Sequence, residues 1–174
     1  MTRWTAAFLC VVAAASGASA QDIPLEYRVK AAYLLNFTRF VEWPAPSTAG
    51  SPLSVCVMRP NPFGTFLSST IGGETAAGRP LTSRVIAAPD PSCSVLFIPS
   101  GVPADALLRA VGNAPVLTVG ESPDFLQRGG MIAFVLEDGR VRFAVNPAAA
   151  ERSHLLISSR LLLLAQRPSP GGGE

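Results

Sequence analysis

Residues 114–146 read APVLTVGESPDFLQRGGMIAFVLEDGRVRFAVN, and the fold is decided in this stretch. Three of its runs are rich in the β-branched and aromatic residues that favour strands. Between the first two runs, Ser122 can cap a short helix that Gly129-Gly130 ends. The predicted strands cover residues 116–119, 131–136 and 141–145, and the predicted helix covers residues 122–128.

The dipeptide Asp138-Gly139 separates the last two runs and is a strong signal for a two-residue β-hairpin turn. Such a turn fixes the register of the two strands, and here it brings apolar residues opposite one another on a single face. A slip of one residue would turn them toward solvent. The predicted cross-strand pairs are Glu137 with Arg140, Leu136 with Val141, Phe134 with Phe143, and Ile132 with Val145.

Short strand-like and helix-like runs alternate through the rest of the chain. This alternation predicts an α/β domain with a mixed, mostly parallel sheet of about six strands, flanked by helices, with an antiparallel hairpin and C-terminal helices at its end. We expect one domain at residues 21–166 and a disordered Pro/Gly tail at residues 167–174. The further predicted strands are 53–58, 81–87 and 93–98, the loops are 44–52 and 72–80, and the further helices are 22–43, 62–70, 103–111, 148–152 and 155–166.

The first helix pattern spans residues 22–43, where Asp22 can cap the helix and Pro44 can end it. Its most regular stripe places Asn36 among apolar side chains. A buried amide without partners costs about 1–3 kcal/mol, so Asn36 either makes a local hydrogen bond or contacts a ligand. The stripe consists of Val29, Ala32, Tyr33, Asn36 and Phe40, and the apolar residues outside it are Leu34, Leu35, Phe37 and Val41.

Residues 1–20 have the pattern of a secretory signal peptide. Arg3 supplies the positive start, residues 4–15 form an apolar core that is too short to span a bilayer, and residues 18–20 (ASA) are a small-x-small cleavage site. An uncleaved membrane anchor is the alternative. Cleavage would remove Cys10 and leave the mature chain outside the cytoplasm.

Cys56 and Cys93 are then the two cysteines that remain, and an even pair in an exported chain predicts a disulfide. In the chain-entropy description, closing the loop between these cysteines would stabilise the folded state by about 4 kcal/mol. Two buried free thiols are the alternative. A metal site is disfavoured because the sequence offers no cluster of further cysteines or histidines.

The charge pattern disfavours nucleic acid as a partner. The formal net charge is +2, Lys30 is the only lysine, and basic residues do not form a run. The only histidine, His154, is predicted to lie at a helix end or on the surface. No motif for nucleotide binding, zinc hydrolysis or acyl transfer is present, so we expect no cofactor, no metal and no catalytic activity.

Four polar residues are candidates for binding a ligand or partner. Arg140 and Arg142 lie on one face of the last strand and can hold an anion together. The alternative is a solvated face on which Glu137 pairs across the hairpin. Glu121 follows a predicted parallel strand, where ligand sites gather, or else complements a helix N-terminus. Asn146 precedes a proline and can cap the next helix.

The last helix pattern contains four consecutive leucines at 161–164, of which Leu162 and Leu163 fall outside the core-facing stripe. Together with Leu34 and Leu35, they exceed what one core needs. Exposed apolar patches usually mark contacts with another chain. The surplus favours a binding protein over an enzyme, and a second copy of the chain is among the candidate partners.

Several further segments can be compared with known families. They are 29–37 (VKAAYLLNF), 40–44 (FVEWP), 119–123 (VGESP), 125–126 (FL), 129–132 (GGMI), 141–146 (VRFAVN), 148–150 (AAA) and 157–162 (ISSRLL). In this order they resemble the YfiR/HmsC-like family of periplasmic proteins, and the resemblance covers nearly the whole mature chain. It implies a sheet flanked by helices, disulfide formation in the periplasm and a role without catalysis.

The resemblance also implies a partner. A protein of this kind binds the periplasmic sensor region of a membrane diguanylate cyclase and holds it inactive, which lowers cyclic di-GMP and biofilm formation. Release would come from a redox change or from an outer-membrane lipoprotein. Cys56 and Cys93 match one cysteine pair of the family. The second pair is absent here, so redox switching through that second pair is not implied.

Two other functions compete with this one. The alternative is a periplasmic small-ligand binder for sensing or uptake, with Asn36, Glu121, Arg142 and Asn146 lining its pocket. An exported hydrolase is disfavoured because the catalytic motifs are missing.

Overall fold

The computed structural model describes residues 22–45 and 50–166. The predictions of a signal peptide at residues 1–20 and of a disordered tail at residues 167–174 lie outside the described residues. Within the described part, no helix combines the length and the hydropathy needed to cross a membrane.

A seven-stranded sheet forms the centre of the protein. Its strands are β2 (Leu53–Met58), β3 (Thr75–Ala76), β4 (Arg79–Ile86), β5 (Val95–Ile98), β6 (Leu117–Gly120), β7 (Ile132–Glu137) and β8 (Arg140–Val145). They lie in the order β3-β4-β2-β5-β6-β7-β8. The inner neighbours are parallel and the two outermost pairs are antiparallel, which confirms the predicted class. The extra strand, β3, comes from residues 72–80, which we expected to form a loop.

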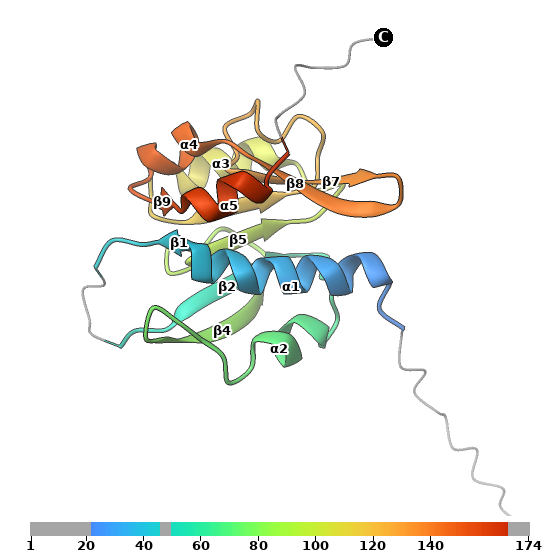
Figure 1. Cartoon of the computed structure of the whole chain (residues 1–174), viewed down its shortest axis with the longest axis horizontal. Coiled ribbons are helices and arrows are strands. Elements are labelled where there is room, and N and C mark those ends of the chain that lie inside the picture. The colour runs from blue at the N-terminus through green and yellow to red at the C-terminus, as the bar shows by residue number, and fades with distance from the viewer. Residues whose placement is uncertain (1–21, 46–49, 167–174) are drawn as a thin grey trace, which may run out of the picture.

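The β7–β8 hairpin has the predicted register, with all four expected cross-strand pairs. Asp138 and Gly139 have φ values of 48° and 70°, as a two-residue hairpin turn requires. Burial at the tip differs from the expectation, because Leu136 is 59% exposed. β6 pairs with β7 only as far as Ala133, so the tip extends beyond its neighbour and has little to pack against (Figure 1).

Within residues 22–45 and 50–166, five helices and a small second sheet complete the fold. The helices are α1 (Leu25–Phe40), α2 (Phe66–Ile71), α3 (Ala104–Val111), α4 (Pro147–Arg152) and α5 (Ser159–Leu164), and the second sheet pairs β1 (Val41–Glu42) with β9 (Leu156–Ile157). Two helix predictions are wrong. Residues 122–128 form turns, and residues 155–166 contain β9 followed by the short α5, whose N-terminus Ser158 caps.

The bounds of α1 also differ from the prediction. The helix begins after Pro24, with no side-chain cap from Asp22, and it ends at Phe40 well before Pro44. Val41 leaves the helix in extended conformation because it pairs with Ile157 of β9. A partner more than a hundred residues away in the sequence therefore sets the end of this helix.

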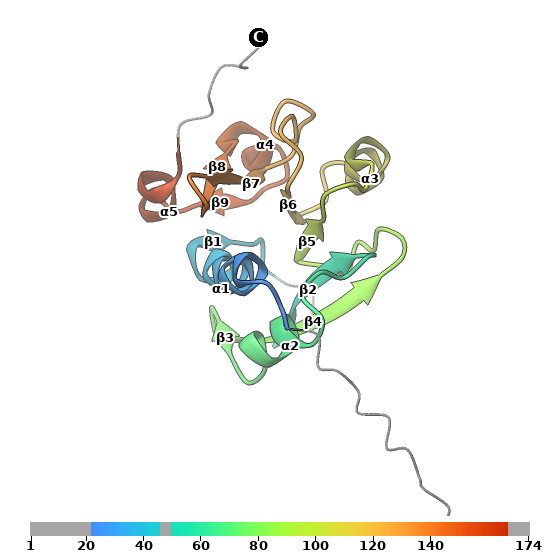
Figure 2. The same cartoon turned by 90° about the vertical axis from the view of Figure 1, so that its right-hand side faces the viewer.

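The sheet curls around α1, which lies on its concave side (Figure 2). The buried face of α1 consists of Lys30, Ala31, Leu34, Phe37 and Thr38. The predicted stripe is wrong, since Asn36 is exposed. Leu34 is fully buried and Leu35 packs against the core. The curved sheet and the neighbouring helices cover a wide arc of α1, so Leu34 and Leu35 are not surplus, and the exposed large apolar residue of this helix is Leu25 at its start.

The opposite face of the sheet is covered by α3 and by the turns at residues 121–130, which together enclose a second core cluster (Figure 2). Phe125 is fully buried there. A Cβ atom on Gly120 would lie 2.4 Å from the Phe125 ring, and one on Gly130 would lie 2.2 Å from it. These two glycines therefore let the ring seat against the backbone and hold the turns onto the end of β6.

Candidate functional site

A buried ion cluster joins α1 to the end of β6. The Lys30 ammonium donates to carboxylate oxygens of Glu26, one helical turn earlier, and of Glu121, directly after β6. The side chains of Lys30 and Glu121 are 6% and 5% exposed. The second oxygen of Glu121 accepts from the Ser100 backbone N–H at 2.7 Å. The carboxyl ends of β5 and β6 are thus tied to the helix that lies across them.

Aromatic rings surround the same ammonium group. The Lys30 Nζ lies 4.7 Å from the centroid of the Tyr27 ring and 5.8 Å from that of the Phe134 ring, distances at which a cation is attracted to the ring face. Burial alone would lower the pKa of Lys30, but the hydrogen bonds to Glu121 and Glu26 outweigh it and raise that pKa above its ordinary value. Burial and the Glu121 charge likewise raise the pKa of Tyr27.

Glu121 therefore has a different environment from the predicted one. We expected it to line a ligand pocket or to complement a helix N-terminus, whereas its carboxylate lies inside the protein and accepts from Lys30 and Ser100. Sequence reasoning missed both Lys30 and Glu26. The available signal was a lone lysine on a largely apolar helix with a glutamate four residues before it.

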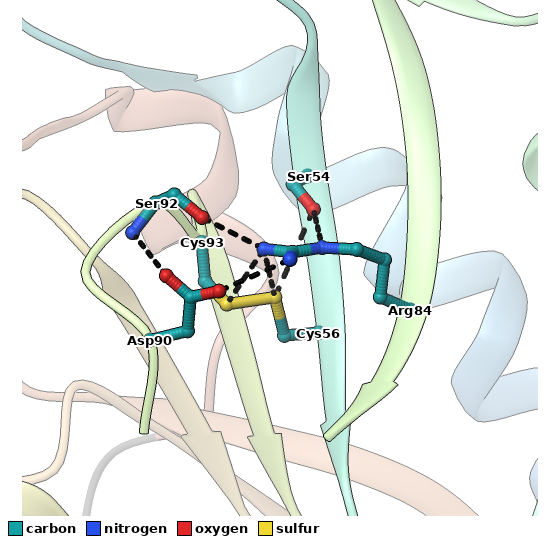
Figure 3. Close-up of polar contacts among 6 residues, drawn as sticks. All are labelled: Ser54, Cys56, Arg84, Asp90, Ser92 and Cys93. Atoms are coloured by element: carbon teal, nitrogen blue, oxygen red, sulfur yellow. Dashed lines mark hydrogen bonds and ion pairs between the residues drawn. A yellow bond between two sulfur atoms is a disulfide. The ribbon is translucent and has the colours of Figure 1, made fainter. Parts of the chain in front are cut away.

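The predicted disulfide joins Cys56 of β2 to Cys93, just before β5, with a Cα–Cα distance of 5.8 Å. Figure 3 shows Arg84 of β4 lying over this bond. One guanidinium nitrogen is 3.7 Å from each sulfur atom and donates to the Ser92 hydroxyl at 2.8 Å. A second nitrogen pairs with Asp90 at 3.0 Å.

These contacts make the disulfide a covered structural crosslink. Both cysteines are buried. The Arg84 side chain reaches from Ser54 of β2 to the loop that carries Asp90. Hydrogen bonds from the Ser92 side chain and backbone, followed by those from Arg84, hold the pKa of Asp90 below its usual value. The loop before β5 is therefore held to β4 by charge as well as to β2 by a covalent bond.

Exposed leucines gather at the C-terminal end of the fold. We call the exposed residues Leu156, Leu162, Leu163 and Leu164 the C-terminal leucines. Leu162 and Leu163, which the sequence singled out, are 37% and 85% exposed. Their neighbour Leu161 is buried and anchors α5 to the core. Of the four leucines expected to exceed the needs of the core, only this C-terminal pair is exposed.

A second exposed apolar region lies between the start of α1 and the hairpin. We call it the hairpin groove; it has a volume of about 490 Å³ and is lined by Leu25, Glu26, Val29, Leu136, Gly139, Arg140, Val141 and Arg142. Arg140 and Arg142 make no ion pair with any described residue. The alternative expectation was a solvated face with Glu137 paired across the hairpin. Both arginines are exposed and Glu137 lies opposite Arg140, but no ion pair forms between them, and the Glu137 carboxylate accepts from the Gln166 amide.

The remaining candidates do not assemble into a pocket. Asn36 is exposed on α1. The side chain of Asn146 accepts from Ala149 N–H at 3.1 Å, as the predicted helix cap, and donates to the Leu126 carbonyl at 3.3 Å. With Glu121 buried and Arg142 in the hairpin groove, the four proposed ligand-pocket residues lie in separate surroundings. Among the described residues, His, Cys, Asp and Glu side chains form no group able to hold a metal ion.

Comparison with known proteins supplies a family. A model of the YfiR/HmsC-like family matches residues 27–166. No curated protein matches the chain. The matched region includes the ion cluster from Tyr27 onward, the disulfide and the C-terminal leucines.

Proposed function

Since the chain belongs to the YfiR/HmsC-like family, we propose that it is a periplasmic repressor that binds the periplasmic sensor region of a membrane diguanylate cyclase. The family is regulatory and non-catalytic, and it acts in cyclic di-GMP signalling through protein–protein contacts. Its members are usually periplasmic. Binding would hold the cyclase inactive, lower cyclic di-GMP and reduce biofilm formation.

The C-terminal leucines are the observation that carries this proposal. Covering a fully exposed leucine side chain is worth about 1.5–3 kcal/mol, and several of them on one short helix and its preceding strand favour association with another surface. Leu161 fixes the orientation of α5, so its outward residues are presented on a defined support. We assign the cyclase contact to Leu162, Leu163 and Leu164.

The ion cluster supports a role in binding over one in catalysis. Ligands of open α/β sheets bind outside the carboxyl ends of the strands. In this protein, Lys30, Glu121 and the Tyr27 ring occupy that region beside β5 and β6. Glu121 is already paired with a cation and a backbone N–H, so it is poorly suited to act as a general base.

The crosslink supports the proposed compartment. Disulfides persist in oxidising environments such as the periplasm. The bond between Cys56 and Cys93 sits beneath Arg84 in the body of the sheet. It is therefore suited to stabilise an exported domain, and the proposed periplasmic location agrees with the predicted signal peptide.

A paired variant experiment tests the proposal. Deleting the gene should raise cyclic di-GMP in the source cells, and the tagged protein should recover a membrane diguanylate cyclase. Leu163→Glu should abolish that recovery and raise cyclic di-GMP to the level of the deletion. Arg160→Glu introduces the same charge on the exposed side of the same helix and should retain repression. Unchanged cyclic di-GMP after deletion would overturn the proposal.

Release and self-association extend the same proposal. An outer-membrane lipoprotein that relieves repression would compete with the cyclase for the C-terminal leucines. Competition is measured by adding the lipoprotein to the immobilised complex and following the cyclase that elutes. If a second copy of the chain covers these leucines instead, sedimentation will show a dimer that Leu163→Glu dissociates, and cyclase recovery will be unaffected.

A further inference from the structure

The last strand of the sheet has an open edge. In a hairpin closed by a two-residue turn, Glu137 and Arg140 exchange both ladder hydrogen bonds. Val141 and Phe143 consequently direct their N–H and C=O groups away from β7. On this outer side, the described backbone pairs only through Gln166, whose N–H donates to the Phe143 carbonyl at 2.8 Å. Phe143 itself is 2% exposed, so the part of the edge left unpaired among the described residues centres on Val141, between the exposed residues Arg140 and Arg142.

The side chains along this edge alternate in chemistry. Arg140 and Arg142 lie on one face of β8, and Val141 lies on the other. The Val141 side joins Leu25 and Val29 of α1 in the hairpin groove. A strand added to this edge would place every second side chain beside the arginines and the intervening side chains beside the apolar wall.

The charges at this edge indicate which kind of segment it would bind. Neither Arg140 nor Arg142 has an acidic partner among the described residues. Both nearby glutamates are engaged, since Glu137 accepts from Gln166 and Glu26 accepts from Lys30. The unpaired guanidinium groups therefore favour carboxylates, and opposite charges directly across a strand pair stabilise the pairing.

The chain itself shows that this edge accepts extended backbone. The bridge between Ala144 and Gln166 is parallel and continues the sheet by one position beyond β8. An added segment could extend the sheet at Val141 by the same kind of backbone hydrogen bond.

We propose that the open edge of β8 binds an extended segment of a partner protein by strand addition, with acidic side chains beside Arg140 and Arg142 and apolar side chains in the hairpin groove. This site uses different residues from the C-terminal leucines. It therefore goes beyond the proposed function, and either proposal can fail while the other stands.

The test uses a synthetic eight-residue peptide that alternates valine and glutamate and carries a fluorophore. Its binding to the full chain is followed by fluorescence anisotropy and by hydrogen exchange of the Val141 amide. The peptide should protect this amide. A matched peptide with lysine in place of glutamate should bind at least tenfold more weakly, because it meets two arginines.

Val141→Pro is the decisive variant. Proline removes an N–H that points away from β7, and its φ suits an edge strand, so the hairpin ladder is retained. The variant should bind the acidic peptide about tenfold more weakly, as expected for the loss of one hydrogen bond. Val141→Ala shortens the same side chain but keeps the N–H, and it should retain most of the affinity.

Reversing the charge at Arg142 tests the proposal without requiring the fold to tolerate proline at position 141. Arg142→Glu should shift the preference from the acidic toward the basic peptide. Equal affinities of the proline and alanine variants, a Val141 amide that the peptide does not protect, or an unchanged charge preference would each overturn the proposal. So would a Val141 amide already protected without peptide, or a dimer that Val141→Pro dissociates, since a second copy would then occupy the edge.

Discussion

Replacing Lys30 with methionine measures how strongly α1 is held against the sheet. The change leaves the buried Glu121 carboxylate with the Ser100 N–H but without its cation. Losing one partner of a buried ion pair costs about 3–5 kcal/mol. We expect the lower end, about 3 kcal/mol, because Glu121 keeps the Ser100 hydrogen bond and the Glu26 side chain is 36% exposed and stays partly hydrated.

The loss is measured by urea denaturation at neutral pH, followed by far-ultraviolet circular dichroism. With a slope of about 2 kcal/mol per molar urea, a loss of about 3 kcal/mol lowers the midpoint by about 1.5 M. Arg39→Met is the matched control on the same helix. It breaks a pair with Glu74 whose side chains are 43% and 42% exposed, so it should cost less than about 1 kcal/mol.

A double variant separates charge from packing. Lys30→Met combined with Glu121→Gln removes both members of the pair and leaves no unpaired buried charge. It should recover most of the lost stability, because the cost arises from the uncompensated carboxylate. Equal losses for Lys30→Met and Arg39→Met, or a double variant no more stable than Lys30→Met, would refute this reasoning.

The remaining predictions concern alkaline pH and the disulfide. Folding raises the pKa of Lys30 and of Tyr27 above their ordinary values of 10.5 and 10.0. Their contribution to stability is therefore complete below about pH 10 and is lost as the pH rises through the folded-state pKa values. When thermal unfolding is measured between about pH 9 and 11, Lys30→Met should lose less stability with rising pH than the natural chain. Reducing the Cys56–Cys93 bond should cost about 4 kcal/mol, or about 10 °C in melting temperature for a domain of this size. Cys56→Ser/Cys93→Ser without reductant should reproduce that shift, and identical melting curves with and without reductant would contradict it.

The hairpin shows what local sequence determines. Asp138-Gly139 and the alternation around it fixed every cross-strand pair, since turn geometry and side-chain period are local properties. The exposure of Leu136 could not be inferred in the same way. It depends on where β6 ends beside β7, and that is a property of the assembled sheet.

The errors in α1 have the same origin. Helical periodicity finds an apolar stripe, but the sheet that curls around the helix decides which residues are buried, and it covers Leu34 while leaving Asn36 exposed. The end of the helix depends on pairing between Val41 and Ile157. The ion pair between Lys30 and Glu121 likewise joins residues 91 positions apart in the sequence, so no local sequence pattern predicts it.

The ion cluster and the hairpin groove are connected through Glu26. This residue lines the groove and also accepts from Lys30. An isolated carboxylate at this position would repel an acidic segment and oppose the attraction of Arg140 and Arg142. Pairing with the only lysine of the chain offsets part of that charge, and Arg140 and Arg142 outweigh the single net negative charge that Lys30, Glu26 and Glu121 carry together. The buried cluster therefore does more than fasten α1 to β6. It leaves the two hairpin arginines to determine the sign of the charge in the groove, and hence the kind of segment that the open edge of β8 can bind.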